Sequence, residues 1–298
     1  MKETIKINFV DFWDGLIKTD NYFYNLLSSK YEVLIDEIDP DIVFFSVDYG
    51  KRNEIKKYLG TKAKIIYYTG ENQLPNWEDI NLAFTFSYDS HAGKNYRLPL
   101  WSLHINWFDR PYIEERDQAY LHDPNLLLNK SLSTEKNKFC NFVYTQPKGR
   151  RVAFFPSISR RFPNSIESSG SFYNNTGIKI HGRGDTVHKI RYLNQFKYTI
   201  SFENESSSGY QTEKIIHPMM VNSIPIYWGN PTPETDFNTK SFIFCNNLTD
   251  DEICDKIQRI ENDEDLYRNI LEQPWFVGND FPDFVKPKNV LKRIEEIL

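Results

Sequence analysis

Short apolar runs recur along the first half of the chain, separated by segments of helical or turn character. The predicted strands lie at residues 5–10, 33–35, 42–47, 65–69 and 82–86, and predicted helices fall between them at residues 21–29 and 53–59. Apolar runs without alternation are typical of strands buried on both faces of a parallel sheet. The pattern therefore predicts an α/β domain whose sheet is covered by helices on both faces.

A second alternation of strands and helices begins near residue 139, after a charged stretch at residues 109–136 that we expect to pack as an irregular bridge. Pro156 falls inside one predicted helix and is expected to break or kink it. The predicted strands are 139–144, 178–181, 198–202, 224–227 and 242–244; the predicted helices are 150–161, 187–196, 210–222, those across 251–271, and 288–298. We therefore expect two domains, residues 1–137 and 138–298.

The segment from residue 198 to residue 227 carries the most informative polar pattern. It is predicted as a strand, a polar loop, a helix and a second strand, with its polar residues gathered at the strand exit and helix entry. Ligands of α/β sheets bind at the carboxyl ends of strands, and phosphates bind to free N–H groups at helix N-termini. Ser208 and Gln211 have the spacing of a capping box, which makes Ser208 the expected N-cap.

Four residues of this segment are candidates for ligand binding. Lys214 is placed in the first turn of the predicted helix, where a cation gains nothing from the helix dipole, so its position favours an anionic ligand. Glu213 is placed to accept hydrogen bonds from hydroxyls or to face a positive charge, and Asn204 and Tyr210 supply neutral donors. The alternative is a capped surface helix with a solvated Glu213–Lys214 pair, and the local pattern alone favours that alternative.

Composition narrows the function classes. The chain has 298 residues, 40% hydrophobic and 26% charged, as in a soluble two-domain protein. A net charge of −5 argues against sequence-independent nucleic-acid binding. The three cysteines, Cys140, Cys245 and Cys254, suit neither a disulfide framework nor a zinc site, which indicates free thiols in a reducing cytoplasm. Neither a signal peptide nor a membrane span is expected.

Four segments of the second half together resemble the α1,3/4-fucosyltransferases of glycosyltransferase family ten, and most of all their bacterial branch. The resemblance keeps residue types, order and spacing. The segments are Phe-Lys-Tyr-Thr-Ile-Ser-Phe-Glu-Asn (196–204), Gly-Tyr-Gln-Thr-Glu-Lys-Ile-Ile (209–216), Ile-Pro-Ile-Tyr-Trp-Gly-Asn-Pro (224–231) and Asp-Phe-Asn-Thr-Lys-Ser-Phe-Ile (236–243). A further match, Ile-Ile-Tyr-Tyr-Thr-Gly-Glu-Asn (65–72), is similar to the segment in which that family carries its catalytic carboxylate.

The resemblance implies the GT-B architecture, in which two Rossmann-like domains face each other across a cleft. Residues 1–137 would hold the acceptor and residues 138–298 the GDP-sugar, with the final helix crossing back to the first domain. The resemblance also implies GDP-fucose as the donor, an inverting mechanism and an oligosaccharide acceptor such as N-acetyllactosamine.

The site residues follow from the same resemblance. Glu71 is the expected general base: a carboxylate at a strand end in an aromatic cleft is partly desolvated, and desolvation raises its pKa and suits it to proton abstraction. Without the resemblance, Glu71 would simply end a strand. Lys214, Asn204 and the helix N-terminus are expected to stabilise the pyrophosphate. Tyr210 is expected to line the donor pocket. Glu213 either faces the oxocarbenium-like sugar or holds ribose hydroxyls, and both roles stay open.

One departure from the family concerns a cation. Bacterial relatives carry an arginine that contacts the pyrophosphate in a Gly-Ser-x-Arg-Asn-Thr-like segment, whereas residues 170–176 here contain none. Arg183, between two glycines, is the first candidate to replace it. The alternative, that Arg183 is an ordinary loop residue, carries equal weight. Lys179 and Arg191 are weaker candidates.

No dedicated metal site and no required cofactor are predicted, while stimulation by divalent cations stays open. His217 and His188 are expected to be structural or exposed, and His91 and His104 are weak candidates for the acceptor cleft. Peripheral contact with the inner membrane and the oligomeric state also stay open. Two rival functions remain: transfer of another GDP-activated deoxysugar in surface polysaccharide assembly, and a catalytically silent carbohydrate-binding module.

Overall fold

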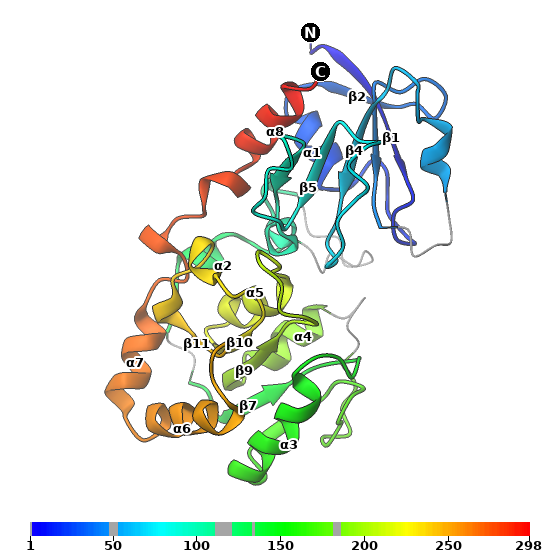
Figure 1. Cartoon of the computed structure of the whole chain (residues 1–298). Coiled ribbons are helices and arrows are strands. Elements are labelled where there is room, and N and C mark those ends of the chain that lie inside the picture. The colour runs from blue at the N-terminus through cyan, green and yellow to red at the C-terminus, as the bar shows by residue number, and fades with distance from the viewer. Residues whose placement is uncertain (1, 48–52, 111–120, 133–134, 181–185) are drawn as a thin grey trace. The chain divides into compact units, whose positions relative to one another are not determined.

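The structure of the chain, a computed structural model, describes residues 2–47, 53–110, 121–132, 135–180 and 186–298. The chain divides into two compact units (Figure 1): unit 1 comprises Met1–Leu103 and Pro282–Leu298, and unit 2 comprises His104–Phe281. Within the described ranges, no helix combines the length and the apolar character that crossing a membrane requires.

Unit 1 is built on a six-stranded sheet in which every pairing is parallel, in the order β2-β1-β3-β4-β5-β6. Its strands are β1 (Thr4–Val10), β2 (Glu32–Ile35), β3 (Ile42–Phe45), β4 (Lys64–Tyr68), β5 (Leu82–Thr85) and β6 (Asn95–Arg97). The central strands β3, β4 and β5 are almost wholly buried. Burial on both faces explains why these strands have continuous apolar runs.

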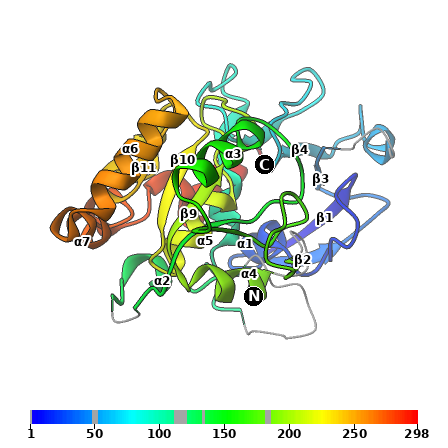
Figure 2. The ribbon, with the colours of Figure 1, turned by 90° about the horizontal axis from the view of Figure 1, so that it is seen from below.

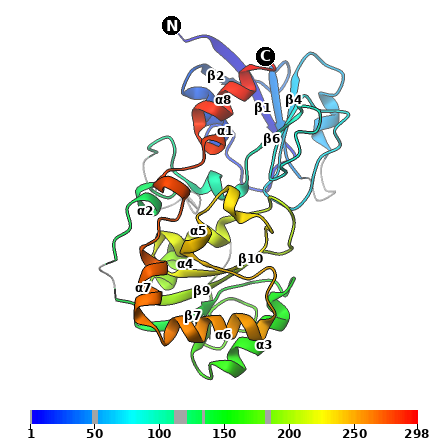
Figure 3. The ribbon, with the colours of Figure 1, turned by 60° about the vertical axis from the view of Figure 1, so that its left-hand side comes forward.

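Helices and 3₁₀ turns complete unit 1. They are α1 (Tyr22–Ser28), η1 (Glu54–Lys57), η2 (Leu100–His104, whose last residue belongs to unit 2), η6 (Asp283–Val285) and α8 (Pro287–Glu295). The final helix α8 lies beside α1 (Figures 1 and 3). Glu295 of α8 accepts hydrogen bonds from Lys30 and from the Tyr31 hydroxyl, so α8 is fastened to the segment that follows α1.

Unit 2 contains a five-stranded parallel sheet in the order β11-β10-β9-β7-β8. Its strands are β7 (Lys138–Phe142), β8 (Ile166–Ser168), β9 (Phe196–Phe202), β10 (Ile224–Trp228) and β11 (Ile243–Phe244). The chain runs from β7 outward to β8 and then returns to the other side of β7 as β9. This reversal of strand order makes a topological switch point at the carboxyl ends of β7 and β9.

Helices cover both faces of the sheet of unit 2. Helices α3 and α6 pack together over one face (Figure 2), and α4 and α5 pack together on the other. The helices and turns of the unit are α2 (Asn125–Leu128), α3 (Arg151–Arg161), α4 (Thr186–Leu193), α5 (Glu213–Met220), η3 (Pro233–Thr235), η4 (Thr239–Ser241), α6 (Asp250–Glu261), α7 (Glu264–Glu272) and η5 (Val277–Asn279). The prediction of two parallel-sheet α/β domains is confirmed.

Of the break or kink expected at Pro156, the break does not occur, because helix α3 continues through this residue. A proline at this position removes the N–H that would bond the carbonyl of Val152, four residues earlier. The Tyr173 hydroxyl donates a hydrogen bond to that carbonyl at 3.3 Å. The side chain of Tyr173 therefore replaces the bond that Pro156 removes.

The boundary between the units lies at residue 103, not at residue 137 as expected. The segment that follows Leu103 packs on unit 2, because Lys130 donates to carbonyls of Leu271 and Gln273, and Asn279 donates to the Leu128 carbonyl. Within unit 1, the helix expected at 53–59 is only the short turn η1.

Candidate active site at the carboxyl edge of the second sheet

Two loops meet closely at the switch point of unit 2. Gly149, in the loop after β7, has a φ of +62°, and a Cβ added to it would lie 2.5 Å from the Asn204 carbonyl oxygen in the loop after β9. A Cβ on Gly170, after β8, would lie 2.1 Å from the Tyr144 carbonyl oxygen. Only glycine fits at these two positions, so the loops after β7, β8 and β9 form one continuous surface.

Glu203 is the buried centre of this surface. Its side chain is fully buried and accepts hydrogen bonds from the Thr212 N–H at 2.7 Å and the Thr212 hydroxyl at 2.8 Å. The Lys214 ammonium lies 3.3 Å from a Glu203 oxygen and 3.5 Å from a Glu213 oxygen. Lys214 thus has two internal counter-charges, and its position does not by itself require an anionic ligand.

Thr212 is the N-cap of α5, so the prediction of Ser208 as the cap was wrong. The expected helix of residues 210–222 is shorter, Glu213–Met220, and it begins at residue 213 because Glu203 holds the Thr212 hydroxyl at its start. Gly209 instead donates its N–H to the Asn230 side chain at 2.8 Å, which folds residues 203–212 into a compact loop.

The electrostatics of the site depend on burial and on two lysines. Burial raises the pKa of Glu203, while Lys214 opposes that effect. Burial alone would also raise the pKa of Glu213, but Lys214 and Lys189 outweigh it and hold that pKa well below its ordinary value. Burial would lower the pKa of Lys214, but the two carboxylates hold it above its ordinary value. Glu213 and Lys214 are therefore charged at neutral pH.

Arg151 is a functional candidate that the sequence reasoning missed. It is 2% exposed, its guanidinium lies 4.2 Å from the centre of the Tyr144 ring, and one Nη donates to the Asn204 side chain. Its Nε finds no hydrogen-bond acceptor among the described residues. By contrast, the neighbouring Arg150 is bound to Asp250 and to two backbone carbonyls. Arg150 is the N-cap of α3 and Arg151 is its first residue, so two cations oppose the helix dipole, and that pattern was available in the sequence.

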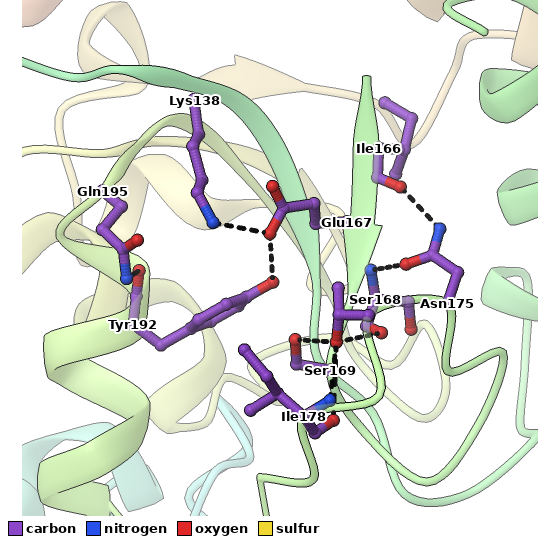
Figure 4. Close-up of polar contacts among 10 residues, drawn as sticks. Lys138, Ile166, Glu167, Ser168, Ser169, Asn175, Ile178, Tyr192 and Gln195 are labelled. Atoms are coloured by element: carbon purple, nitrogen blue, oxygen red, sulfur yellow. Dashed lines mark hydrogen bonds and ion pairs between the residues drawn. The ribbon is translucent and has the colours of Figure 1, made fainter. Parts of the chain in front are cut away.

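The loop after β8, where the family resemblance led us to expect an arginine, is held by its own amide side chains. Asn175 accepts a hydrogen bond from the Ser168 N–H at 2.7 Å and donates to the Ile166 carbonyl at 2.8 Å (Figure 4). Asn174 donates to the carbonyl of Gly170 at 2.9 Å. Of the cations proposed to replace the arginine, Lys179 and Arg191 are exposed, and Arg183 lies outside the described residues.

The same figure shows how β8 is joined to its neighbours. Glu167 on β8 accepts from the Lys138 ammonium at 2.9 Å and from the Tyr192 hydroxyl at 3.3 Å (Figure 4). These contacts link β8 to β7 and to α4. They fix the strand from which the loop after β8 emerges, so that loop starts from a defined position.

Glu71 follows the carboxyl end of β4 in unit 1. Its N–H donates to the Thr69 hydroxyl at 3.0 Å, and that hydroxyl donates to its carbonyl oxygen at 3.0 Å. Its backbone is thereby held, while its half-buried carboxylate accepts no hydrogen bond from another residue of the described ranges. A carboxylate held in place and open to a proton donor is what general-base catalysis requires.

Unit 1 also contains a hollow of about 420 Å³ at the carboxyl end of β1, the switch point of its own sheet. It is lined by Asn8, Phe9, Val10, Asp11, Phe12, Trp13, Asp14, Gly15, Leu16, Lys18, Glu37, Glu54, Lys57 and Tyr58. Trp13 is 40% exposed there, so its ring offers an open aromatic face. Glu71 does not line this hollow.

The predicted site residues fall into three groups. Asn204, Glu213 and Lys214 lie together at the start of α5 and the end of β9 in unit 2. Tyr210 belongs to the same loop but is only 3% exposed, so little of its ring reaches the surface. Glu71 belongs to unit 1, and Arg183 is among the residues outside the description.

Two parallel α/β units, with polar residues at the carboxyl edge of each sheet, define the class of GT-B glycosyltransferases, as the sequence predicted. Solved structures agree. A crystal structure of an α1,3-fucosyltransferase is similar with a TM-score of 0.77 and 26% identity, over 99% of this chain and 90% of the other. A crystal structure of an α1,3-fucosyltransferase with GDP gives 0.76 and 27% over the same shares.

Sequence comparisons identify the family. Residues 7–104 match the model of the α-(1,3)-fucosyltransferase FucT N-terminal domain, and residues 133–275 match that of the glycosyltransferase family 10 (fucosyltransferase) C-terminal region. The chain is 28% identical to the α-(1,3)-fucosyltransferase FucT of Helicobacter pylori. The match covers 90% of this chain and 59% of that relative, so the chain spans less than two thirds of the relative's length. The chain belongs to glycosyltransferase family 10, the fucosyltransferases.

Proposed function

We propose that the protein transfers L-fucose from GDP-fucose to a hydroxyl of an N-acetylglucosamine-containing acceptor, with inversion and in α1,3 linkage. The observation that carries this proposal is the buried guanidinium of Arg151 at the switch point of unit 2, whose Nε has no acceptor among the described residues. The family membership and the similarity to a fucosyltransferase solved with GDP support the choice of nucleotide.

Unit 2 would hold the donor. The pyrophosphate would bind beside the start of α5, at the positive end of the helix dipole and near the Lys214 ammonium. Arg151 supplies a guanidinium, which suits phosphate oxygens better than an ammonium because it donates two parallel hydrogen bonds. Asn204 is placed to donate its amide N–H, since its oxygen already accepts from Arg151. Arg151 therefore takes the role for which the sequence suggested Arg183.

The reaction forms one bond and breaks one. The acceptor oxygen attacks the anomeric carbon of fucose, the bond from that carbon to the β-phosphate oxygen breaks, and GDP leaves with the bonding electrons. Glu71 takes the proton of the acceptor hydroxyl. Lys214 and Arg151 stabilise the negative charge that grows on the β-phosphate, which is where preorganised charge lowers the barrier most.

Glu213 is the residue that we place opposite the sugar or its nucleotide. Because Lys214 and Lys189 keep it ionised, it can stabilise oxocarbenium character at the anomeric carbon or accept from ribose hydroxyls. Unit 1 would bind the acceptor, and the exposed ring of Trp13 in its hollow is suited to stacking on a sugar ring. The three cysteines are buried free thiols, which supports a reducing cytoplasm as the compartment.

The proposal is tested by isothermal titration of the purified chain with GDP, and with UDP as the control nucleotide. GDP should bind and UDP should not, and Arg151→Met should weaken GDP. In parallel, the chain is incubated with GDP-fucose and N-acetyllactosamine, and the product is measured by mass spectrometry. Binding of GDP without transfer of fucose would favour another GDP-deoxysugar as the donor. The absence of an arginine from the loop at residues 170–176 is compatible with such a change of donor.

A further inference from the structure

Three histidines from distant parts of the sequence converge inside unit 2. The ring nitrogens available as ligands on His104, His122 and His217 lie within 4.8 Å of one another. Ring centres are 5.4 Å apart between His104 and His217, and 5.3 Å apart between His122 and His217. His104 and His217 are buried and His122 is half-buried, so the cluster is shielded from solvent.

The backbone places two of these histidines side by side. Ile105 pairs with His122 as an isolated parallel bridge. The His122 N–H donates to the His104 carbonyl, and the Asn106 N–H donates to the His122 carbonyl, both at 2.8 Å. The third histidine, His217, comes from α5. Two ligands on a paired segment and one on a helix make a set that the fold holds in place before any ion binds.

The surroundings of His217 point to a ligand for its ring. It is 2% exposed, and neither ring nitrogen has a hydrogen-bond partner among the residues that the structure describes. Buried polar atoms are normally bonded, because leaving them unpaired forfeits their hydration. A bound metal ion would accept the lone pairs of ring nitrogens and so supply the partner that the His217 ring lacks.

We propose that His104, His122 and His217 bind a zinc ion. Imidazole nitrogens are ordinary ligands of zinc, and three protein ligands with one further position are a common zinc arrangement. Zinc–nitrogen bonds of about 2.0–2.1 Å in a tetrahedron bring the nitrogens to roughly 3.4 Å from one another. Separations of at most 4.8 Å reach that value by small rotations of the three side chains.

The ion would fasten the segment that opens unit 2 to α5. This helix begins with Glu213 and Lys214, one turn before His217, and Glu213 interacts electrostatically with His104. The zinc site therefore borders the proposed donor site without overlapping it. Glu213 also lowers the cost of placing a dication beside Lys189 and Lys214, which both act on these rings with positive charge.

The experiment uses the untagged full chain, stripped with EDTA, desalted, and titrated with Zn²⁺ and with Co²⁺. Zinc content after desalting is measured by mass spectrometry, the coordination by the visible spectrum of the cobalt form, and stability by the melting temperature. His122→Gln removes the least buried ligand. His188→Gln removes an exposed histidine of α4 outside the cluster and is the matched control.

We expect one zinc per chain, a tetrahedral cobalt spectrum, and a melting temperature that rises with zinc. Substitution of a residue that only supports a metal ligand lowers metal affinity by up to about 100-fold. His122→Gln removes a ligand and should lower zinc affinity by more than that, whereas His188→Gln should bind zinc as the parent does. Failure of the parent chain to retain zinc, or unchanged binding by His122→Gln, would overturn the proposal. Zinc retention by the parent chain is measured without any variant, so it does not depend on whether a variant folds. It is also independent of fucosyl transfer, so an inactive enzyme would not be mistaken for a chain that lacks the zinc site.

Discussion

The ion pair between Glu203 and Lys214 should contribute a strong electrostatic coupling in unit 2. Their charged atoms lie 3.3 Å apart, Glu203 is fully buried, and the Lys214 side chain is 16% exposed. At an effective dielectric constant of about 20, two unit charges at that distance attract by roughly 5 kcal/mol. Part of this attraction offsets desolvation, so we expect a coupling free energy of about 3 kcal/mol in a double-mutant cycle.

The cycle consists of Lys214→Met, Glu203→Gln and the double variant, compared by thermal unfolding in a calorimeter. Lys214→Met alone leaves the Glu203 carboxylate buried without its cation and should destabilise the fold by about 3–5 kcal/mol. The double variant removes both charges. It should therefore be more stable than Lys214→Met, although it carries one more substitution.

The matched control is the pair Lys197–Glu261, whose atoms are closer, at 2.7 Å, but whose side chains are each 28% exposed. Solvent screening should reduce its coupling to less than about 1 kcal/mol. If the Glu203 and Lys214 substitutions were additive within about 0.5 kcal/mol, or if the control pair coupled more strongly, the reasoning from burial would be refuted.

The remaining predictions concern single positions. Glu71→Gln should lower kcat by about 10²–10⁴-fold and leave the Kd for GDP unchanged, and a weakened Kd would remove Glu71 from the base role. Arg151→Met should weaken GDP by about 10–100-fold, and Arg151→Lys should restore only part of that loss; equal affinities would contradict a phosphate contact. Tyr173→Phe should cost about 1 kcal/mol of unfolding free energy in the parent chain. The same substitution should cost much less in a Pro156→Ala background, because the N–H of the new alanine donates to the same Val152 carbonyl. Since neighbouring lysines hold the pKa of Glu213 below its ordinary 4.5, its charge stabilises the fold above pH 4.5 and this stability is lost as the pH falls. Glu213→Gln should therefore flatten the acid side of the stability profile, and an unchanged slope there would contradict the ion pair.

The sheets were predictable because their strands carry their own signal. Residues 42–45, 65–68 and 82–84 are apolar, and they form the buried centre of the first sheet. The edge strands β6 and β8, of three residues each, were missed, whereas β2 and β11 at the opposite edges were predicted at residues 33–35 and 242–244. The final helix was expected to cross back only because of the family resemblance.

The errors at the site arose where a distant side chain decides a local structure. Ser208 had the right spacing for an N-cap, but Glu203 holds Thr212 at that position. Pro156 was expected to break or kink its helix, but the helix continues and Tyr173 supplies the missing hydrogen bond. A single sequence records neither contact, because the partners come together only in the folded chain.

The functional candidates divide in the same way. Asn204, Glu213 and Lys214 were found because they are contiguous with the strand and helix that present them. Arg151 was missed although it lies at the start of a helix, where a cation favours an anionic ligand by the same reasoning as for Lys214. The three histidines could not have been grouped, since His104, His122 and His217 have no spacing typical of a metal motif.

Fucosyl transfer by the purified chain tests the central claim most directly. The chain and its Glu71→Gln variant are incubated with GDP-fucose and with type 1 and type 2 acceptors, and the product is measured by mass spectrometry. We predict fucosylated N-acetyllactosamine with the parent chain, and none with Glu71→Gln although that variant still binds GDP. Transfer by the variant at the parental rate, or no transfer by a parent chain that binds GDP-fucose, would contradict the account.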